Sequence, residues 1–186
     1  RRKIHFLPPY RADGARKLSG WLGLPAKDVK ARASQALCRA VIAQRSIKSA
    51  AEVDEIEQAL AVTREMYLAA MAMTRPGVRE HEIMGRIEGI ALGRGCRTAF
   101  PSIVTVNGQV LHNHGYGNAL TEGRLLIDDS GAESPAGYAS DITRTIPVSG
   151  RFTPRQRACY ESVLRVLDKA MSLMVPGNTI DKLNQE

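Results

Sequence analysis

Hydrophobic and polar positions repeat with two different periods along the chain, which separates helical from strand-like segments. From Ala51 apolar residues recur close to helical spacing with charged residues between them. The stripe consists of Val53, Ile56, Leu60, Tyr67 and Met71. It predicts a long amphipathic helix that ends before Arg75-Pro76-Gly77, because proline and glycine interrupt helices.

A second helix is predicted over residues 79–94. Ile83, Ile87 and Ile90 lie on one of its faces, and Gly95 is a suitable stop. We expect these apolar stripes to pack into the core.

A third helix is predicted to begin at Thr153, whose side chain can cap it. Pro154 suits the first helical position, and Gln156 completes a capping box. This helix is predicted to end before Pro176-Gly177.

Between these helices, residues 102–148 have the apolar, β-branched composition of strands. The strand-like segments are 103–106, 125–127 and 142–146, and Asn107-Gly108 marks a turn. The expected fold class is therefore α+β, with a β-rich centre between helices.

Residues 1–49 differ in composition and charge from the rest of the chain. They contain several prolines and glycines and one Ala/Val/Leu-rich stretch, 30–43, which predicts a single short helix. They also hold 12 Lys and Arg against 2 acidic residues, while the remainder has 14 against 17. A basic segment can bind nucleic acid. Because it has no recognition motif and no interleaved stacking aromatics, we expect a solvated or domain-packing surface and no nucleic-acid partner.

Composition narrows the class of protein further. With 186 residues, 44% of them hydrophobic, the chain can bury a core. Its longest apolar run is far short of the roughly 20 residues that span a bilayer, so no membrane segment is expected. The three cysteines, Cys38, Cys96 and Cys159, match neither a disulfide framework nor a zinc-finger spacing. Reduced thiols in a cytoplasmic protein are the simplest interpretation.

Two aspartates carry the candidate chemistry. Asp129 follows an apolar strand, and Asp141 lies in the next strand-like segment, beyond a turn. Paired strands can place two carboxylates side by side, where their repulsion is relieved by a cation. Hard oxygen ligands suit Mn, Mg or Zn-type ions, and two such ions roughly 3.5 Å apart can activate water and polarise a carbonyl. From spacing alone, two such aspartates are more often a turn residue and an edge-strand residue that face water.

The flanking motifs favour the metal site. The segments are Val110-Leu111-His112-Asn113-His114, Leu126 to Glu133, and Gly137 to Val148 with its Ser140-Asp141-Ile142-Thr143-Arg144-Thr145 core. Together, the stretch from Val104 to Leu164 resembles the pita-bread metallopeptidases of the Xaa-Pro aminopeptidase and prolidase kind. The resemblance implies that the aspartates of Asp-x-Gly and Ser-Asp-x-Thr-Arg-Thr, here Asp129 and Asp141, bind metal. It also implies that His112 binds or polarises the substrate, with His114 as a further substrate-binding candidate.

Two departures from the family pattern matter. Asp128 stands where the family has an apolar residue, so it competes with Asp129 as the ligand, although the Asp-x-Gly pattern favours Asp129. The two aspartates are 141 − 129 = 12 residues apart, one more than the common spacing, which a longer turn can absorb. The family's remaining ligands, one His and two Glu, are expected beyond residue 186, so the chain is expected to be a fragment.

The resemblance implies a fold and a function. Residues 1–49 are expected to be the C-terminal remnant of an N-terminal α/β domain plus a linker, and residues 50–186 the first half of a pita-bread domain. The expected activity is that of an aminopeptidase with two divalent metal ions, manganese first and zinc or cobalt as alternatives. Its substrates would be peptides with proline in the second position, and the full-length protein would be a homodimer. A prolidase, a creatinase-type hydrolase and a non-catalytic binding protein of the same fold are the alternatives.

Overall fold

The computed structural model describes residues 4–185. The chain divides into two compact units, Arg1–Val53 and Asp54–Glu186. The sequence placed a boundary a few residues earlier, between 49 and 50. That residues 1–49 are the remnant of a further domain stays a prediction.

The first unit is more helical than its sequence predicted. Instead of one short helix it contains α1 (Ala12–Leu22), α2 (Ala26–Val29), a 3₁₀ turn (Lys30–Arg32) and α3 (Gln35–Ser46). The prediction was wrong because several glycines and prolines of this unit do not mark loops but lie within or at the ends of helices. Gly20 lies within α1, Gly23 ends that helix with a φ of 63°, and Pro25 is the N-cap of α2. The Ser34 side chain caps α3 by accepting the Leu37 N–H at 3.2 Å.

The long predicted helix is confirmed as α4 (Ala50–Met73), but the predicted core face is only partly correct. Val53 and Met71 are 44% and 45% exposed. The buried residues are instead Ala59, Thr63, Met66, Tyr67 and Ala70. This face is rich in small and hydroxyl-bearing side chains, so a search for large apolar residues identified only Tyr67 among them.

The second predicted helix is confirmed as α5 (Glu80–Gly93). Ile83 and Ile87 are fully buried and Ile90 is half-buried. Gly95 follows with a φ of 74°, a left-handed conformation that favours glycine after a helix.

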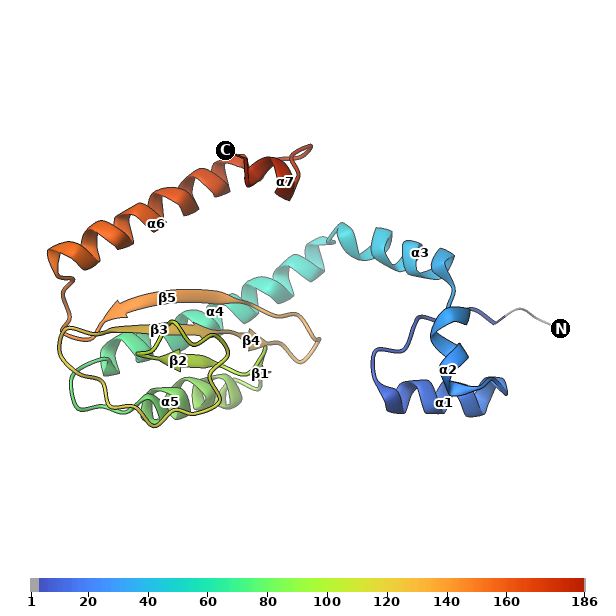
Figure 1. The fold of residues 1–186 in the computed structure, drawn as a ribbon, viewed down its shortest axis with the longest axis horizontal. Coiled ribbons are helices and arrows are strands. Elements are labelled where there is room, and N and C mark those ends of the chain that lie inside the picture. Colours follow the sequence, from blue (N-terminus) through green and yellow to red (C-terminus); the bar gives the residue numbers. More distant parts are fainter. Residues whose placement is uncertain (1–3, 186) are drawn as a thin grey trace. The chain divides into compact units, whose positions relative to one another are not determined.

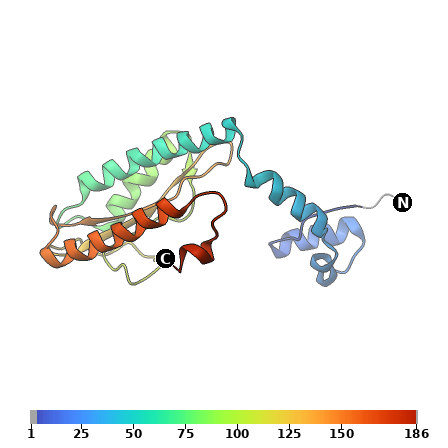
Figure 2. The ribbon, with the colours of Figure 1, turned by 90° about the horizontal axis from the view of Figure 1, so that it is seen from above.

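The predicted strands are confirmed and form a three-stranded antiparallel sheet in the order β2-β3-β5. Its strands are β2 (Ile103–Thr105), β3 (Leu125–Ser130) and β5 (Ile142–Pro147). A small two-stranded sheet pairs β1 (Arg97–Thr98) with β4 (Ala132–Glu133). Figures 1 and 2 show α4 and α5 on one face of the larger sheet and the next helix, α6, on the other. The core lies between that sheet and helices α4 and α5, where one buried cluster contains Met66, Ile83, Ile87, Val104, Leu126 and Ile146.

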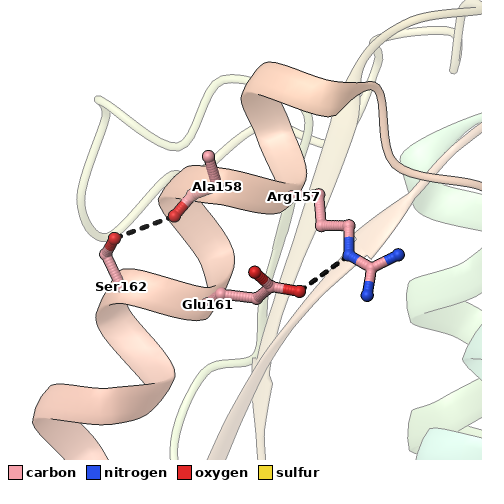
Figure 3. Close-up of polar contacts among 4 residues, drawn as sticks. All are labelled: Arg157, Ala158, Glu161 and Ser162. Atoms are coloured by element: carbon pink, nitrogen blue, oxygen red, sulfur yellow. Dashed lines mark hydrogen bonds and ion pairs between the residues drawn. The ribbon is translucent and has the colours of Figure 1, made fainter.

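The third predicted helix is confirmed as α6 (Pro154–Leu173), with the Thr153–Gln156 capping box in place. The Gln156 side chain also donates to the Gly123 carbonyl at 2.9 Å. Figure 3 shows two contacts on α6, the Arg157–Glu161 ion pair at 2.7 Å and the Ser162 hydroxyl on the Ala158 carbonyl at 2.8 Å. No residue of α6 is buried. A short helix, α7 (Ile180–Leu183), follows.

Within residues 4–185, none of the helices combines the length and the apolar character that a bilayer-spanning segment requires.

Candidate metal centre

A cleft of about 570 Å³ on the face of the sheet away from α4 and α5 is lined by the four residues that the sequence predicted for the site, Asp129, Asp141, His112 and His114. Asp129 comes from β3, Asp141 lies immediately before β5, and His112 and His114 come from the loop between β2 and β3. The remaining lining residues are Phe100, Pro101, Ile103 and Asn113. None of these four was predicted from the sequence as a site residue, because apolar residues at or before the start of a strand and one Asn in a loop carry no distinctive signal.

Asp129 faces the cleft because side chains alternate along a strand. In β3, Leu126, Asp128 and Ser130 are buried on the core side, while Leu125, Ile127 and Asp129 are half-exposed on the other. Asp129 pairs with Thr143 of β5, whose hydroxyl donates to Asp129 Oδ1 at 2.9 Å. That hydrogen bond orients the carboxylate.

Asp141 is exposed and is one residue outside the strand to which the sequence assigned it, because β5 begins at Ile142. Its neighbour Ser140 is buried, and Ile142 opposes Ser130 across the β3–β5 ladder. Pairing of β3 with β5 therefore places Asp129 and Asp141 on neighbouring segments of the chain.

Asp128 lies on the opposite face from Asp129 and is fully buried. The Ser130 hydroxyl donates to Asp128 Oδ1 at 2.8 Å, and Oδ2 has no hydrogen-bond partner among the described residues. Burial raises the pKa of Asp128 to about 6; the Ser130 hydrogen bond opposes this change, and the charge of Asp129 adds to it. Geometry therefore separates the two consecutive aspartates, and only Asp129 reaches the cleft.

Tyr67 of α4 contacts the backbone on the core side of the same aspartates. Its hydroxyl proton is shared between the carbonyl oxygens of Asp128, at 2.9 Å, and Ile142, and its oxygen accepts the Ser130 N–H at 3.3 Å. Burial, assisted by the negative charge of Asp128, raises the pKa of Tyr67, so the hydroxyl keeps its proton. From the sequence, Tyr67 was predicted only as a core residue of the apolar stripe, and its hydrogen bonds to the strands were not foreseen.

The loop that carries His112 and His114 is held at both ends by Glu80, a fully buried residue of α5. Glu80 accepts the Val106 N–H at 2.8 Å and the Asn118 N–H at 3.2 Å, and the Asn118 side-chain amide donates to both carboxylate oxygens. Sequence reasoning missed Glu80, because a Glu in the first turn of a helix is usually a solvated residue.

His112 has a positive φ of 56°. A left-handed backbone at a residue other than glycine costs roughly 1–2 kcal/mol and is concentrated at binding sites. His112 is exposed, so its imidazole is accessible from the cleft.

The cleft has the chemistry of a cation site. It holds two carboxylates, and none of its lining residues is a lysine or arginine that could neutralise them. Carboxylate oxygens suit hard divalent ions. Within residues 4–185 no group of three or more His, Cys, Asp or Glu side chains is arranged to hold a metal. The described residues therefore fit a divalent metal as part of a ligand set.

Known proteins resemble this chain in sequence and in fold. The profile of metallopeptidase family M24 matches residues 54–186. The Xaa-Pro aminopeptidase of Haemophilus influenzae is 40% identical over 147 residues, which cover 76% of this chain and 34% of that protein. The solved structure of Pseudomonas aeruginosa aminopeptidase PepP matches with a TM-score of 0.84 at 31% identity, over 100% of this chain and 43% of that one. Prolidase from Pyrococcus furiosus matches with a TM-score of 0.73 at 30% identity, over 79% and 44%.

These comparisons confirm the expected fold class, a mixed helix and strand fold of the pita-bread type. The chain spans about a third of the length of the curated relatives it matches.

Proposed function

Because the chain belongs to metallopeptidase family M24, we propose that it supplies Asp129 and Asp141 as ligands of a divalent metal pair in an aminopeptidase. The reaction is the release of the first residue from peptides with proline in the second position. Manganese is the proposed metal, with zinc or cobalt as alternatives. We propose that one His and two Glu of the parent protein complete the ligand set, as the resemblance implies.

One observation carries this proposal. Asp129, Asp141, His112 and His114 line a single cleft although they come from β3, the residue before β5 and a loop, while the competing Asp128 is buried on the other face. A metal pair bound there supplies Lewis acidity toward the substrate carbonyl and an activated water.

In this proposal the chain's own residues orient the metal ligands and bind the peptide substrate. The Thr143 hydroxyl fixes the Asp129 carboxylate, and the His112 imidazole donates a hydrogen bond to the carbonyl oxygen of the scissile bond. His114 contacts the peptide beside it. The apolar side chains of Phe100 and Ile103 form the part of the wall that suits an apolar substrate group.

The test uses the full-length protein and an Xaa-Pro-Xaa tripeptide. Release of the first residue is expected to require Mn²⁺ and to fall to background in Asp141→Ala. Asp168→Ala is the matched control, because Asp168 is an exposed aspartate on α6 outside the cleft and its loss is expected to leave the rate unchanged. Activity that survives Asp141→Ala would contradict the metal assignment.

A prolidase is the second candidate, supported by the match to Pyrococcus furiosus prolidase. Cleavage of Xaa-Pro dipeptides in preference to tripeptides would favour it, and a creatinase-type hydrolase would cleave neither.

A non-catalytic binding protein is the remaining candidate; a parent sequence with no His and no Glu pair after residue 186 would favour that function. The homodimer and the cytoplasmic location stay predictions, which the mass of the native protein and cell fractionation test.

A further inference from the structure

The face of α4 that packs on the sheet carries two buried hydroxyls, those of Thr63 and Tyr67. The two residues are four positions apart, so they lie on the same side of the helix. The core face of an amphipathic helix is usually apolar. Both hydroxyls instead contact the strands that bear the proposed metal ligands.

Tyr67 holds the backbone on both sides of Asp129. Its hydroxyl contacts the Asp128 carbonyl before that residue and the Ser130 N–H after it. The same hydroxyl donates to the carbonyl of Ile142, the residue that follows Asp141. One side chain thus links the two carboxylate-bearing segments.

Thr63 contacts the segments just after β3 and just before β5. Its Oγ1 lies 2.6 Å from the Ser140 hydroxyl and accepts the Ala132 N–H at 3.0 Å. Ser140 directly precedes Asp141, and its own N–H donates to the Ala132 carbonyl at 2.9 Å. All three residues are almost completely buried, so these contacts are shielded from water.

Asp141 is therefore flanked by Ser140, which contacts Thr63, and by Ile142, which contacts Tyr67. Asp129 is flanked on both sides by residues that contact Tyr67. The 24-residue helix α4 is a rigid support for both segments, whereas Asp141 lies just before β5, outside the regular strand.

We propose that Thr63 and Tyr67 are positioning residues that fix the relative placement of the Asp129 and Asp141 carboxylates and thereby set the divalent-metal affinity of the site. This rests on the proposed function, because it takes the two aspartates as metal ligands. The packing of α4 needs only the shape of the two side chains, which Val and Phe preserve; the positioning role needs the hydroxyls.

The experiment measures Mn²⁺ binding to the full-length protein by electron paramagnetic resonance of the free ion, without substrate. Thr63→Val and Tyr67→Phe are each expected to raise the Mn²⁺ dissociation constant about tenfold, as for residues that orient metal ligands through hydrogen bonds. Thr63→Ser keeps the hydroxyl and is expected to bind Mn²⁺ like the wild type. Titrations are made at a temperature at which circular dichroism shows all variants folded.

Thr74→Val is the matched control. Thr74 directly follows α4 and is also buried, but its hydroxyl donates only to the Ala70 carbonyl of the helix itself, at 2.7 Å. Its loss is expected to lower the melting temperature and to leave the dissociation constant within twofold of wild type.

The two possible failures are distinguishable. If Asp129→Asn loses Mn²⁺ while Thr63→Val and Tyr67→Phe bind it like the wild type, the positioning proposal is wrong and the proposed metal site stands. If Asp129→Asn binds Mn²⁺ as tightly as the wild type, the metal site is wrong, and the positioning proposal is overturned with it.

Discussion

Asp128 and Asp129 are consecutive residues whose side chains lie on opposite faces of β3, Asp128 fully buried against the core and Asp129 in the cleft with Asp141. The alternation of a strand thus assigns two adjacent carboxylates to different environments.

The first prediction concerns that assignment. Asp129→Asn is expected to weaken Mn²⁺ binding by about 100-fold, because it replaces a charged oxygen ligand of a hard cation with a neutral amide. Asp128→Asn is expected to leave the affinity within a few-fold. Isothermal titration calorimetry with Mn²⁺ measures the affinity of both variants. An equal loss of affinity in both would contradict the assignment of Asp129 to the cleft and Asp128 to the core.

The second prediction concerns the pH dependence of stability. The pKa of Asp128 is raised from 3.8 to about 6 in the folded chain, so folding favours the protonated form. Its contribution to stability is fully present below pH 3.8 and is lost as the pH rises through about 6. At roughly 1.4 kcal/mol per pKa unit, the loss is about 3 kcal/mol.

Asp128→Asn cannot ionise and is expected to lack this contribution. Chemical denaturation of metal-free protein between pH 4 and pH 7 is the measurement, with the wild type minus Asp128→Asn difference isolating one group. A difference that stays constant with pH would show that Asp128 is ionised throughout that range.

The third prediction concerns the loop that carries the histidines. Glu80→Ala leaves the buried Val106 N–H and the Asn118 amide without their acceptor, which is expected to destabilise the fold by about 3 kcal/mol or more. It is also expected to raise KM for the peptide, because the His112 loop loses its attachment. Glu82→Ala is the control. The Glu82 carboxylate, at the start of the same helix, accepts the exposed Arg79 N–H. Its loss is expected to lower the free energy of unfolding by about 1 kcal/mol and to leave KM unchanged.

The fourth prediction concerns the glycine of the Asp-x-Gly motif. A Cβ on Gly131 would lie 1.9 Å from the Ser140 carbonyl oxygen, so the backbones of the two segments approach too closely for any side chain. Gly131→Ala is expected to destabilise the protein by about 3 kcal/mol or more. Gly89→Ala on the exposed side of α5, where a Cβ meets no atom within 4 Å, is expected to stabilise it by up to about 1 kcal/mol. Thermal unfolding of both variants is the measurement.

The fifth prediction separates the chemistry of His112 from its conformation. Asn tolerates the left-handed backbone that His112 adopts, so His112→Asn is expected to keep the melting temperature. Loss of the imidazole is expected to lower kcat/KM by about 100-fold. A variant with full activity would exclude the imidazole from the reaction.

Much of this arrangement was readable from the sequence, because it depends on local signals. The capping box at Thr153, the stop at Gly95 and the strand that ends in Asp129 all follow from residues within a few positions. The choice of Asp129 over Asp128 came from the Asp-x-Gly pattern, and the structure agrees with it, because Asp128 is buried and Asp129 lines the cleft.

The remainder depends on contacts between distant segments. The hydroxyl of Tyr67 reaches Ser130 across 63 positions, and Thr63 reaches Ser140 across 77. No period in the sequence marks a Thr as a partner for a strand backbone. The same reason explains Glu80, whose partners lie 26 and 38 positions away.

The short separation of Asp129 and Asp141 also has a kinetic consequence. The entropy lost on closing a loop increases with its length, so a hairpin between β3 and β5 closes more readily than the contacts of Tyr67 or Thr63. We therefore expect the carboxylate pair to come together early in folding and to become rigid only when α4 docks. On this order the docking of α4, and not the formation of the helix itself, fixes the pair, so a variant with slow docking is expected first to accumulate with both aspartates adjacent but not yet fixed.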